Sequence, residues 1–432
     1  MENCMDFRIF QRGEDGYARV SLTGDLPDTD TDVRAVEASV IREDDNLTIL
    51  RRLKGTADGK HWKIEAAIPE GGLYRIDIAG PRGILKRYYH IGVGDVYVTC
   101  GQSNMTGYGR DNAYDPPVLG VHMLANSGKW AIAAHPLASP VDSIFAFPEN
   151  DTGTSPALSF ARRLKERLGV PIGIVPTAVG GTKLDRWAPD EIGDCAAEMF
   201  RRLELIGEFK GFLWYQGCSD AYENDAPSYY ERFCRMIAAW RERYGHHPVL
   251  TVQLNRWMGL RGEDHSRWWG LIRDAQRRAG LELDDVVTVP SLDLPLTDGI
   301  HNSSGANVII GERLANAACH YIYRRPDGQA VPNVIGAERI DDAHLFLRVT
   351  PGLDIRTLDN RAEGMAVEDE TGLIECCEAI PDGDRLILTT ARPYSLPAVF
   401  HYAWDNRSIL FPARDFHDMP LLACYGVEIK DL

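Results

Sequence analysis

The feature that most constrains the fold is a short apolar run that ends at a glycine. Residues 96–100 are mostly β-branched or aromatic, which predicts a buried strand. Gly101 follows directly and permits a sharp turn, which places Ser103 just past the strand. Reactive groups of open α/β sheets gather at that edge, so Ser103 is a candidate nucleophile. The alternative is that it only caps a helix, as serines in strand-to-helix turns usually do.

The middle of the chain alternates short apolar runs with longer amphipathic stretches. The predicted strands cover 96–100, 172–175, 212–215, 249–252 and 286–289. The predicted helices run from Pro156, capped by Ser155, to Gly169, and then over 230–244, 266–279 and 303–323. This alternation predicts a parallel sheet covered by helices on both faces, within a domain of residues 93–325.

The two ends of the chain have a different pattern. Residues 1–92 and 326–432 contain short runs in which apolar and polar residues alternate, separated by turn residues. They predict two small β domains, the first of them sandwich-like. Each could bind carbohydrate or only position the middle domain, and the sequence leaves both open.

Three further segments follow predicted strands of the middle domain. Gly180 and Gly181 form a glycine pair whose backbone N–H groups can face a ligand, although a tight turn would also explain them. Gln216 offers an amide N–H after the next strand. Asp298 lies three residues before His301, close enough for its carboxylate to orient the imidazole. Together with Ser103 these groups would supply the parts needed for acyl transfer.

These segments are also family motifs. The chain has G-Q-S-N-M at 101–105, G-G-T at 180–182 followed by Trp187, W-Y-Q-G at 214–217 and D-G-I-H at 298–301. In this order they resemble the SGNH-type hydrolases of the sialate O-acetylesterase-like and carbohydrate acetylesterase group. The resemblance implies a flavodoxin-like SGNH core of three α/β/α layers with a parallel sheet, flanked here by the two small β domains.

The same resemblance implies roles for individual residues. Ser103 would be the nucleophile, His301 the base and Asp298 its orienting partner. The oxyanion would receive hydrogen bonds from the backbone N–H of Ser103, from Gly180 and from the Gln216 side chain. One position departs from the family, which often has Glu after the W-Y-Q-G motif, whereas this chain has Cys218. A small buried thiol is the simplest interpretation of that cysteine.

Aromatic and arginine side chains between and after the motifs suit a sugar ring. Arg110, Trp187 and Arg256 are the predicted substrate-binding residues, with Trp187 as the wall of the site. No His, Asp or Glu cluster has the spacing of a metal site, and neither a metal nor a cofactor is expected.

Charge and the N-terminus exclude some classes of partner. The chain has a net charge of −16, which disfavours nucleic acid and anionic membrane surfaces. Residues 1–6 lack the basic start and apolar run of a secretion signal, so we expect a cytoplasmic protein. Its oligomeric state, a homo-oligomer included, is left open.

The predicted function is therefore a serine esterase that removes O-acetyl groups from a carbohydrate. Its substrate would be an acetylated oligosaccharide or an O-acetyl sialic acid. The alternatives are a general short-chain esterase or thioesterase, and a carbohydrate-binding protein whose hydrolase core is inactive.

Overall fold

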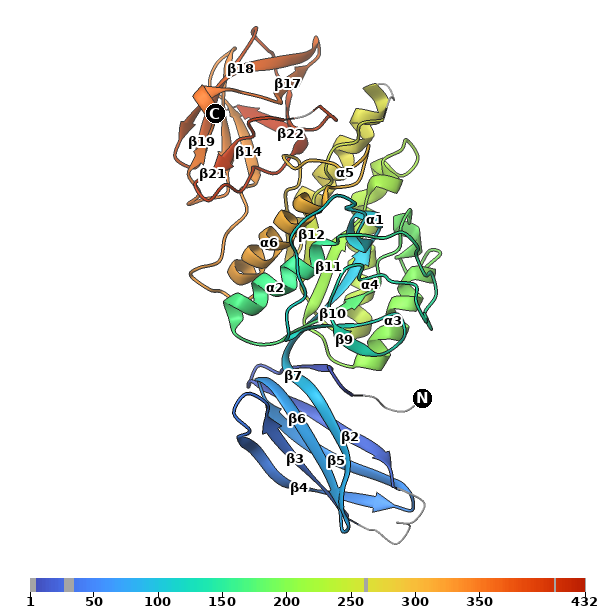
Figure 1. Ribbon diagram of the computed structural model, residues 1–432. Coiled ribbons are helices and arrows are strands. Elements are labelled where there is room, and N and C mark those ends of the chain that lie inside the picture. Colours follow the sequence, from blue (N-terminus) through green and yellow to red (C-terminus); the bar gives the residue numbers. More distant parts are fainter. Residues whose placement is uncertain (1–4, 27–34, 260–262, 408, 432) are drawn as a thin grey trace.

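The computed structural model describes residues 5–26, 35–259, 263–407 and 409–431. It has three parts along one axis: β strands at the N-terminal end, a mixed α/β part, and a C-terminal group of strands (Figure 1). The first four residues, part of the stretch searched above for a secretion signal, lie outside the described residues. Within the described ranges, no helix is long and apolar enough to cross a membrane.

The N-terminal part is built from antiparallel strands. Its strands are β2 (Tyr17–Asp25), β3 (Ala35–Arg42), β4 (Thr48–Asp58), β5 (His61–Pro69) and β6 (Gly71–Gly80), paired in the order β6-β3-β4-β5-β2. Burial alternates residue by residue along β2 and β5, as the period of two in the sequence predicts. The inward side chains form a hydrophobic cluster of their own.

One long strand, β7 (Gly83–Gly101), joins the first part to the second. Its first half pairs with β6, the middle pairs with β1 (Ile9–Gln11), and from Asp95 onward it pairs with β10 (Ile172–Pro176). The boundary that the sequence predicts between residues 92 and 93 therefore falls inside a single strand.

The middle part contains a parallel run of strands in the order β8-β10-β7-β11-β12-β13, with β9 antiparallel to β8. The strands not yet bounded are β8 (Val121–Leu124), β9 (Trp130–Ile132), β11 (Gly211–Tyr215), β12 (Val249–Val252) and β13 (Val286–Val289). Every residue of β10 to β13 is buried, as expected for strands covered on both faces. The predicted parallel pairing is confirmed, but β8 and β9 had not been predicted.

Helices cover this sheet. They are α1 (Ser103–Thr106), α2 (Pro156–Leu168), α3 (Asp194–Ile206), α4 (Tyr229–Tyr244), α5 (Glu263–Glu282) and α6 (Ser304–Tyr321). The helix α2 begins and ends as predicted, because the Ser155 side chain accepts from the N–H of Ala157 and Gly169 adopts a left-handed conformation. Helices α2 and α6 pack on each other and α4 packs on α5.

The C-terminal part is a closed barrel. Its strands are β14 (Val334–Arg339), β15 (His344–Val349), β19 (Arg385–Thr390), β18 (Gly372–Asp382), β17 (Met365–Asp369), β20 (Val399–Tyr402) and β22 (Cys424–Asp431). A short pair, β16 (Ile355–Arg356) with β21 (Arg414–Asp415), lies beside it. The barrel docks on α5, where buried Arg273 donates to the carbonyls of Ala403 and Asp405.

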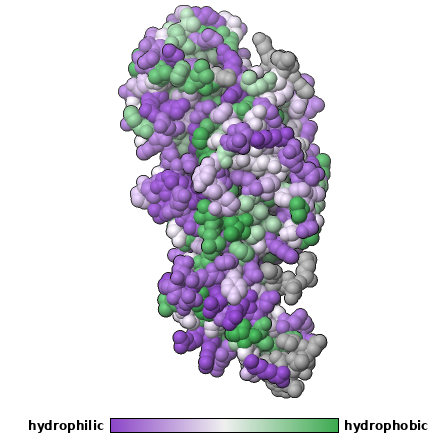
Figure 2. Space-filling model, viewed as in Figure 1, coloured by the Kyte–Doolittle hydropathy of each residue, from purple (hydrophilic) through white to green (hydrophobic). Residues whose placement is uncertain are grey.

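On the face shown in Figure 2, hydrophilic side chains predominate over the N-terminal strands, and hydrophobic ones gather over the middle of the molecule.

Candidate active site

The turn after β7 positions Ser103. Gly101 has φ +113°, and a Cβ there would lie 2.3 Å from the carbonyl oxygen of Tyr215, so only glycine fits. The N–H of Gln102 donates to that same carbonyl, 2.9 Å away. Ser103 is then the first residue of α1, and its side chain is largely buried. Its N–H has no acceptor within the helix, as at any helix start.

His301 and Asp298 lie in the loop between β13 and α6. Nε2 of His301 is 2.9 Å from Oγ of Ser103, and Nδ1 of His301 is 2.7 Å from Oδ2 of Asp298. Oδ1 of Asp298 also accepts from the N–H groups of Ile300 and His301. Partial burial raises the pKa of Asp298, but these hydrogen bonds outweigh it, and the pKa falls below the ordinary value.

Asn104, the residue after the serine, holds the two loops together. Its Oδ1 accepts from the N–H of Asn302, and its Nδ2 donates to the carbonyl of Ile300. These bonds fix the histidine loop relative to the serine turn. The motif G-Q-S-N-M thus contributes a brace as well as Ser103, a role that the sequence analysis did not assign.

Tyr108 and Glu149 complete the surroundings of His301 in a way that the sequence did not reveal. The Tyr108 ring stacks on His301, with centroids 4.8 Å apart. The Tyr108 hydroxyl donates to Oε2 of Glu149, and Oε1 of Glu149 accepts from the N–H of Gly180. The predicted oxyanion donor of the glycine pair is therefore occupied by a carboxylate of the same chain.

A cavity of about 540 Å³ opens over these groups. Ser103, His301, Gly180 and Glu149 line it together with Tyr108, Phe147, Val179, Tyr222 and Ile300. Cys218 also lines this cavity and is largely buried. Burial raises the pKa of its thiol to about 12, so the thiol is neutral at neutral pH.

Gln216 is not where the sequence analysis placed it. Its side chain is fully buried, and its Nε2 donates to the carbonyl of Thr182 and to Oδ2 of Asp220, at 3.0 and 2.5 Å. Its Oε1 accepts from the hydroxyl of Tyr229. Because both amide hydrogens are already used inside the protein, the prediction that this side chain donates to an oxyanion is wrong for this conformation.

The predicted substrate-binding residues are also placed differently. Trp187 is fully buried, packs edge-to-face on Trp214 and donates to Oγ1 of Thr182, so it forms core and not a cavity wall. Arg256 donates to backbone carbonyls, including that of Leu294 at 3.0 Å, and does not line the cavity. Arg110 is exposed and reaches the site only through the Tyr108 ring.

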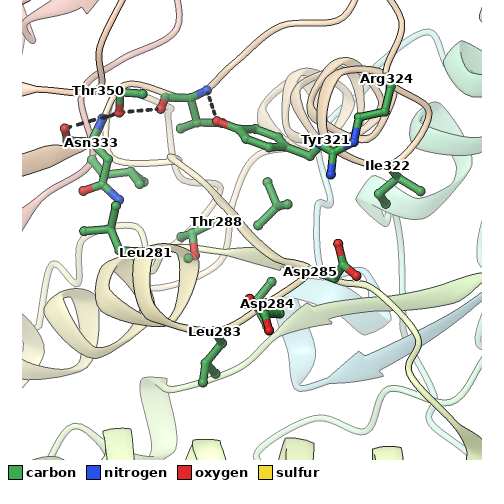
Figure 3. A pocket seen from close by; sticks show the side chains of 15 residues that line it. Leu281, Leu283, Asp284, Asp285, Thr288, Tyr321, Ile322, Arg324, Asn333 and Thr350 are labelled. Carbon is green, nitrogen blue, oxygen red and sulfur yellow. Dashed lines mark hydrogen bonds between the residues drawn. The ribbon is translucent and has the colours of Figure 1, made fainter.

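A second cavity, of about 340 Å³, lies between the turn that joins α5 to β13, the end of α6 and the start of the barrel (Figure 3). Its lining includes Asp284, Asp285, Thr288 and Arg324. It adjoins the amino end of β13, whereas Ser103 follows the carboxyl end of β7, so the two cavities lie at opposite ends of the parallel strands. In the described ranges, no group of three or more His, Cys, Asp or Glu is arranged to hold a metal ion.

Comparison with known proteins defines the class of the chain. The family model for carbohydrate esterases described as sialic acid-specific acetylesterases matches residues 93–320, more than half of the chain, and this places it among the carboxylic ester hydrolases. The chain belongs to that carbohydrate esterase family.

Two relatives are similar over different extents. A probable carbohydrate esterase of Arabidopsis thaliana is 31% identical over 249 residues, which cover 51% of this chain and 89% of the relative. The crystal structure of a carbohydrate acetylesterase from Xanthomonas citri superimposes with a TM-score of 0.72 and 23% identity, covering 97% of each chain. That second likeness extends to the flanking β parts and concerns the fold.

Proposed function

We propose that this chain is a serine esterase that removes O-acetyl groups from a carbohydrate, with Ser103, His301 and Asp298 as a catalytic triad. The observation that carries the proposal is the line of contacts at the base of the cavity. Oγ of Ser103, the imidazole of His301 and the carboxylate of Asp298 are joined by distances of 2.9 and 2.7 Å. Distances in this range suit proton transfer from a nucleophile to a base held by an acid.

The reaction would proceed in two acyl-transfer steps. Ser103 Oγ attacks the acetyl carbonyl carbon while His301 Nε2 takes its proton, and Asp298 stabilises the imidazolium. His301 then returns the proton to the sugar oxygen as the bond to the acetyl carbon breaks, leaving acetyl on Ser103. Water, deprotonated by His301, then attacks the acetyl carbon, and His301 returns the proton to Ser103 Oγ as the bond between Oγ and that carbon breaks and acetate leaves. The N–H groups of Ser103 and Gly180 would stabilise the oxyanion in both steps.

The proposal includes the organisation of the chain. Residues 93–325 would form an SGNH-type three-layer core, and residues 1–92 and 326–432 the flanking β domains. The parallel strand order and the helix contacts support the first part, and the separate hydrophobic clusters of the N-terminal strands and of the barrel support the second. The triad would then lie at the carboxyl edge of the sheet, where such sites form.

An acetate-release assay tests the function. Acetylated xylan fragments, acetylated mannan fragments and O-acetyl sialic acid would be compared with 4-nitrophenyl acetate and butyrate, with Ser103→Ala as the control. We expect acetate from at least one sugar, and faster cleavage of 4-nitrophenyl acetate than of butyrate. Cleavage of aryl esters alone would favour a general esterase, and no cleavage of any ester by the folded protein would contradict the proposal.

A further inference from the structure

Among the described residues that line the cavity there is one carboxylate, Glu149, and it belongs to the long connection between β9 and α2. Glu149 is half-buried, with one oxygen on the Gly180 N–H and the other 2.9 Å from the Tyr108 hydroxyl. A Cβ on residue 180 would lie 3.0 Å from Oε2 of Glu149, so the glycine leaves room for this carboxylate. Both hydrogen-bond donors are neutral groups.

In the described part of the chain, Glu149 forms no ion pair with a lysine or arginine, since its partners are Tyr108 and the Gly180 N–H. Among the described residues that line the cavity there is no lysine or arginine. The basic side chains nearby are already engaged elsewhere: Arg110 pairs with Asp151 at 3.1 Å, and Lys183, just past the glycine pair, pairs with Asp225 at 2.7 Å. Burial accordingly raises the pKa of Glu149 above the ordinary value, although its two hydrogen bonds oppose this.

Substrate binding must change the contacts of Glu149. The ester carbonyl needs the Gly180 N–H as the oxyanion forms, so Glu149 has to give up that donor. A sugar hydroxyl can replace it, because a hydroxyl donates readily to a carboxylate. A carboxylate on the sugar offers no proton, and it would add a second negative charge in a space partly shielded from water.

Resting on the proposed function, we propose that Glu149 selects the substrate class: the cavity takes an O-acetyl sugar that has no acidic group and rejects O-acetyl sialic acids. The family description names sialic acid, whereas the described lining of this cavity presents a carboxylate, Glu149. A cavity built for a sialic acid would be expected to present a lysine or arginine to the sugar carboxylate, and the described lining has neither.

A matched pair of substrates tests the proposal. 9-O-acetyl-N-acetylneuraminic acid and its C1 methyl ester carry the same acetyl group and differ by one charge. Acetate release would be measured for both. We expect kcat/KM to be higher for the methyl ester by about tenfold, the scale of one like-charge contact in a partly shielded site. In Glu149→Gln, which keeps the size and the acceptor oxygen for Gly180, the ratio should fall to within about twofold.

Asp142→Asn is the matched control, because Asp142 is an exposed carboxylate on the same connection that does not line the cavity. Its ratio should equal that of the wild type. If Glu149→Gln fails to fold, salt provides a second test on the wild type: raising ionic strength from about 0.01 M to about 1 M shortens the Debye length from about 30 to about 3 Å and should narrow the ratio.

The outcomes separate the two proposals. No acetate from the neutral methyl ester, nor from any other ester, would overturn the proposed function itself. Equal rates on both substrates, a preference for the acid, or a ratio that persists in Glu149→Gln would overturn the selection by Glu149 and leave the esterase function standing.

Discussion

The two sides of the cavity are in different states. On one side Ser103, His301 and Asp298 are already joined at hydrogen-bonding distances, and Asn104 braces the two loops that carry them. On the other side the Gly180 N–H is occupied by Glu149. Under the proposed mechanism, the nucleophile would thus be assembled before substrate binds, whereas the position of the ester oxygen would be occupied by Glu149 until substrate displaces it.

The largest effect should come from the assembled side. Ser103→Ala removes the attacking oxygen but no buried packing of consequence, so kcat should fall by at least ~10³ while the protein remains folded. Steady-state kinetics with 4-nitrophenyl acetate and a thermal melt would measure both. A variant that keeps more than about a tenth of the wild-type kcat would mean that Ser103 is not the nucleophile.

Asp298 and His301 should behave as one unit. Each alone is expected to lower kcat by ~10²–10⁴, and removing both should cost little more than removing His301. A double-mutant cycle of Asp298→Ala and His301→Ala on kcat/KM provides the test. If the two single losses in kcat/KM multiply in the double variant, the two residues act independently and the 2.7 Å contact between them does not contribute to catalysis.

Gln216 tests the comparison between the two sides of the cavity, because the sequence analysis expected its side chain to donate to the oxyanion and the structure places it in the core. Gln216→Ala removes one hydrogen bond each from Asp220, Thr182 and Tyr229, which should lower the free energy of unfolding by about 2–4 kcal/mol. Its kcat should change less than about tenfold, compared with ~10²–10³ for a lost oxyanion donor. Urea unfolding and steady-state kinetics on the same preparation would separate the effect on stability from the effect on kcat. A large loss of kcat at unchanged stability would mean that Gln216 does take part in catalysis.

The smallest expected effect is a change with pH in the preference between the two sialic acid substrates, and it arises from Glu149. Because burial raises the pKa of Glu149, its carboxyl gains a proton at a higher pH than an exposed glutamate does. As pH falls through that pKa, the repulsion of an acidic sugar disappears, so the preference for the neutral methyl ester should narrow at acid pH and widen as pH rises.

Taking the ratio of kcat/KM values for the two substrates cancels any pH dependence of the free enzyme that the two substrates share. Burial raises the pKa of Tyr108 to about 12, so its hydroxyl stays protonated throughout the range. A preference that does not change with pH in the wild type, or that changes equally in Glu149→Gln, would count against the charge of Glu149.

Local signals account for what the sequence predicted. Apolar runs indicated β10 to β13, the Ser155 cap and Gly169 set the ends of α2, and the spacing of Asp298 and His301 anticipated their contact. The direction of a side chain is not local. Gln216 and Trp187 both belong to the family motifs, yet packing against α4 and β11 turns their side chains inward.

Glu149 is a residue of the site that the sequence did not predict. It belongs to a connection without hydrophobic periodicity, and only the folded chain brings it from that connection to Gly180, 31 residues later. The strand β7 also continues through the predicted domain boundary. Its first half pairs with β6 and its last residues pair with β10, and the pattern of apolar residues along a strand does not show which strands it will pair with.

Labelling with phenylmethanesulfonyl fluoride tests the central claim most directly. Peptide mass spectrometry after complete inactivation should find one sulfonyl group on Ser103, with labelling slowed by 4-nitrophenyl acetate and abolished in His301→Ala. Complete inactivation with the label on another residue, such as Cys218, or an unlabelled Ser103 in an inactivated enzyme, would contradict the account.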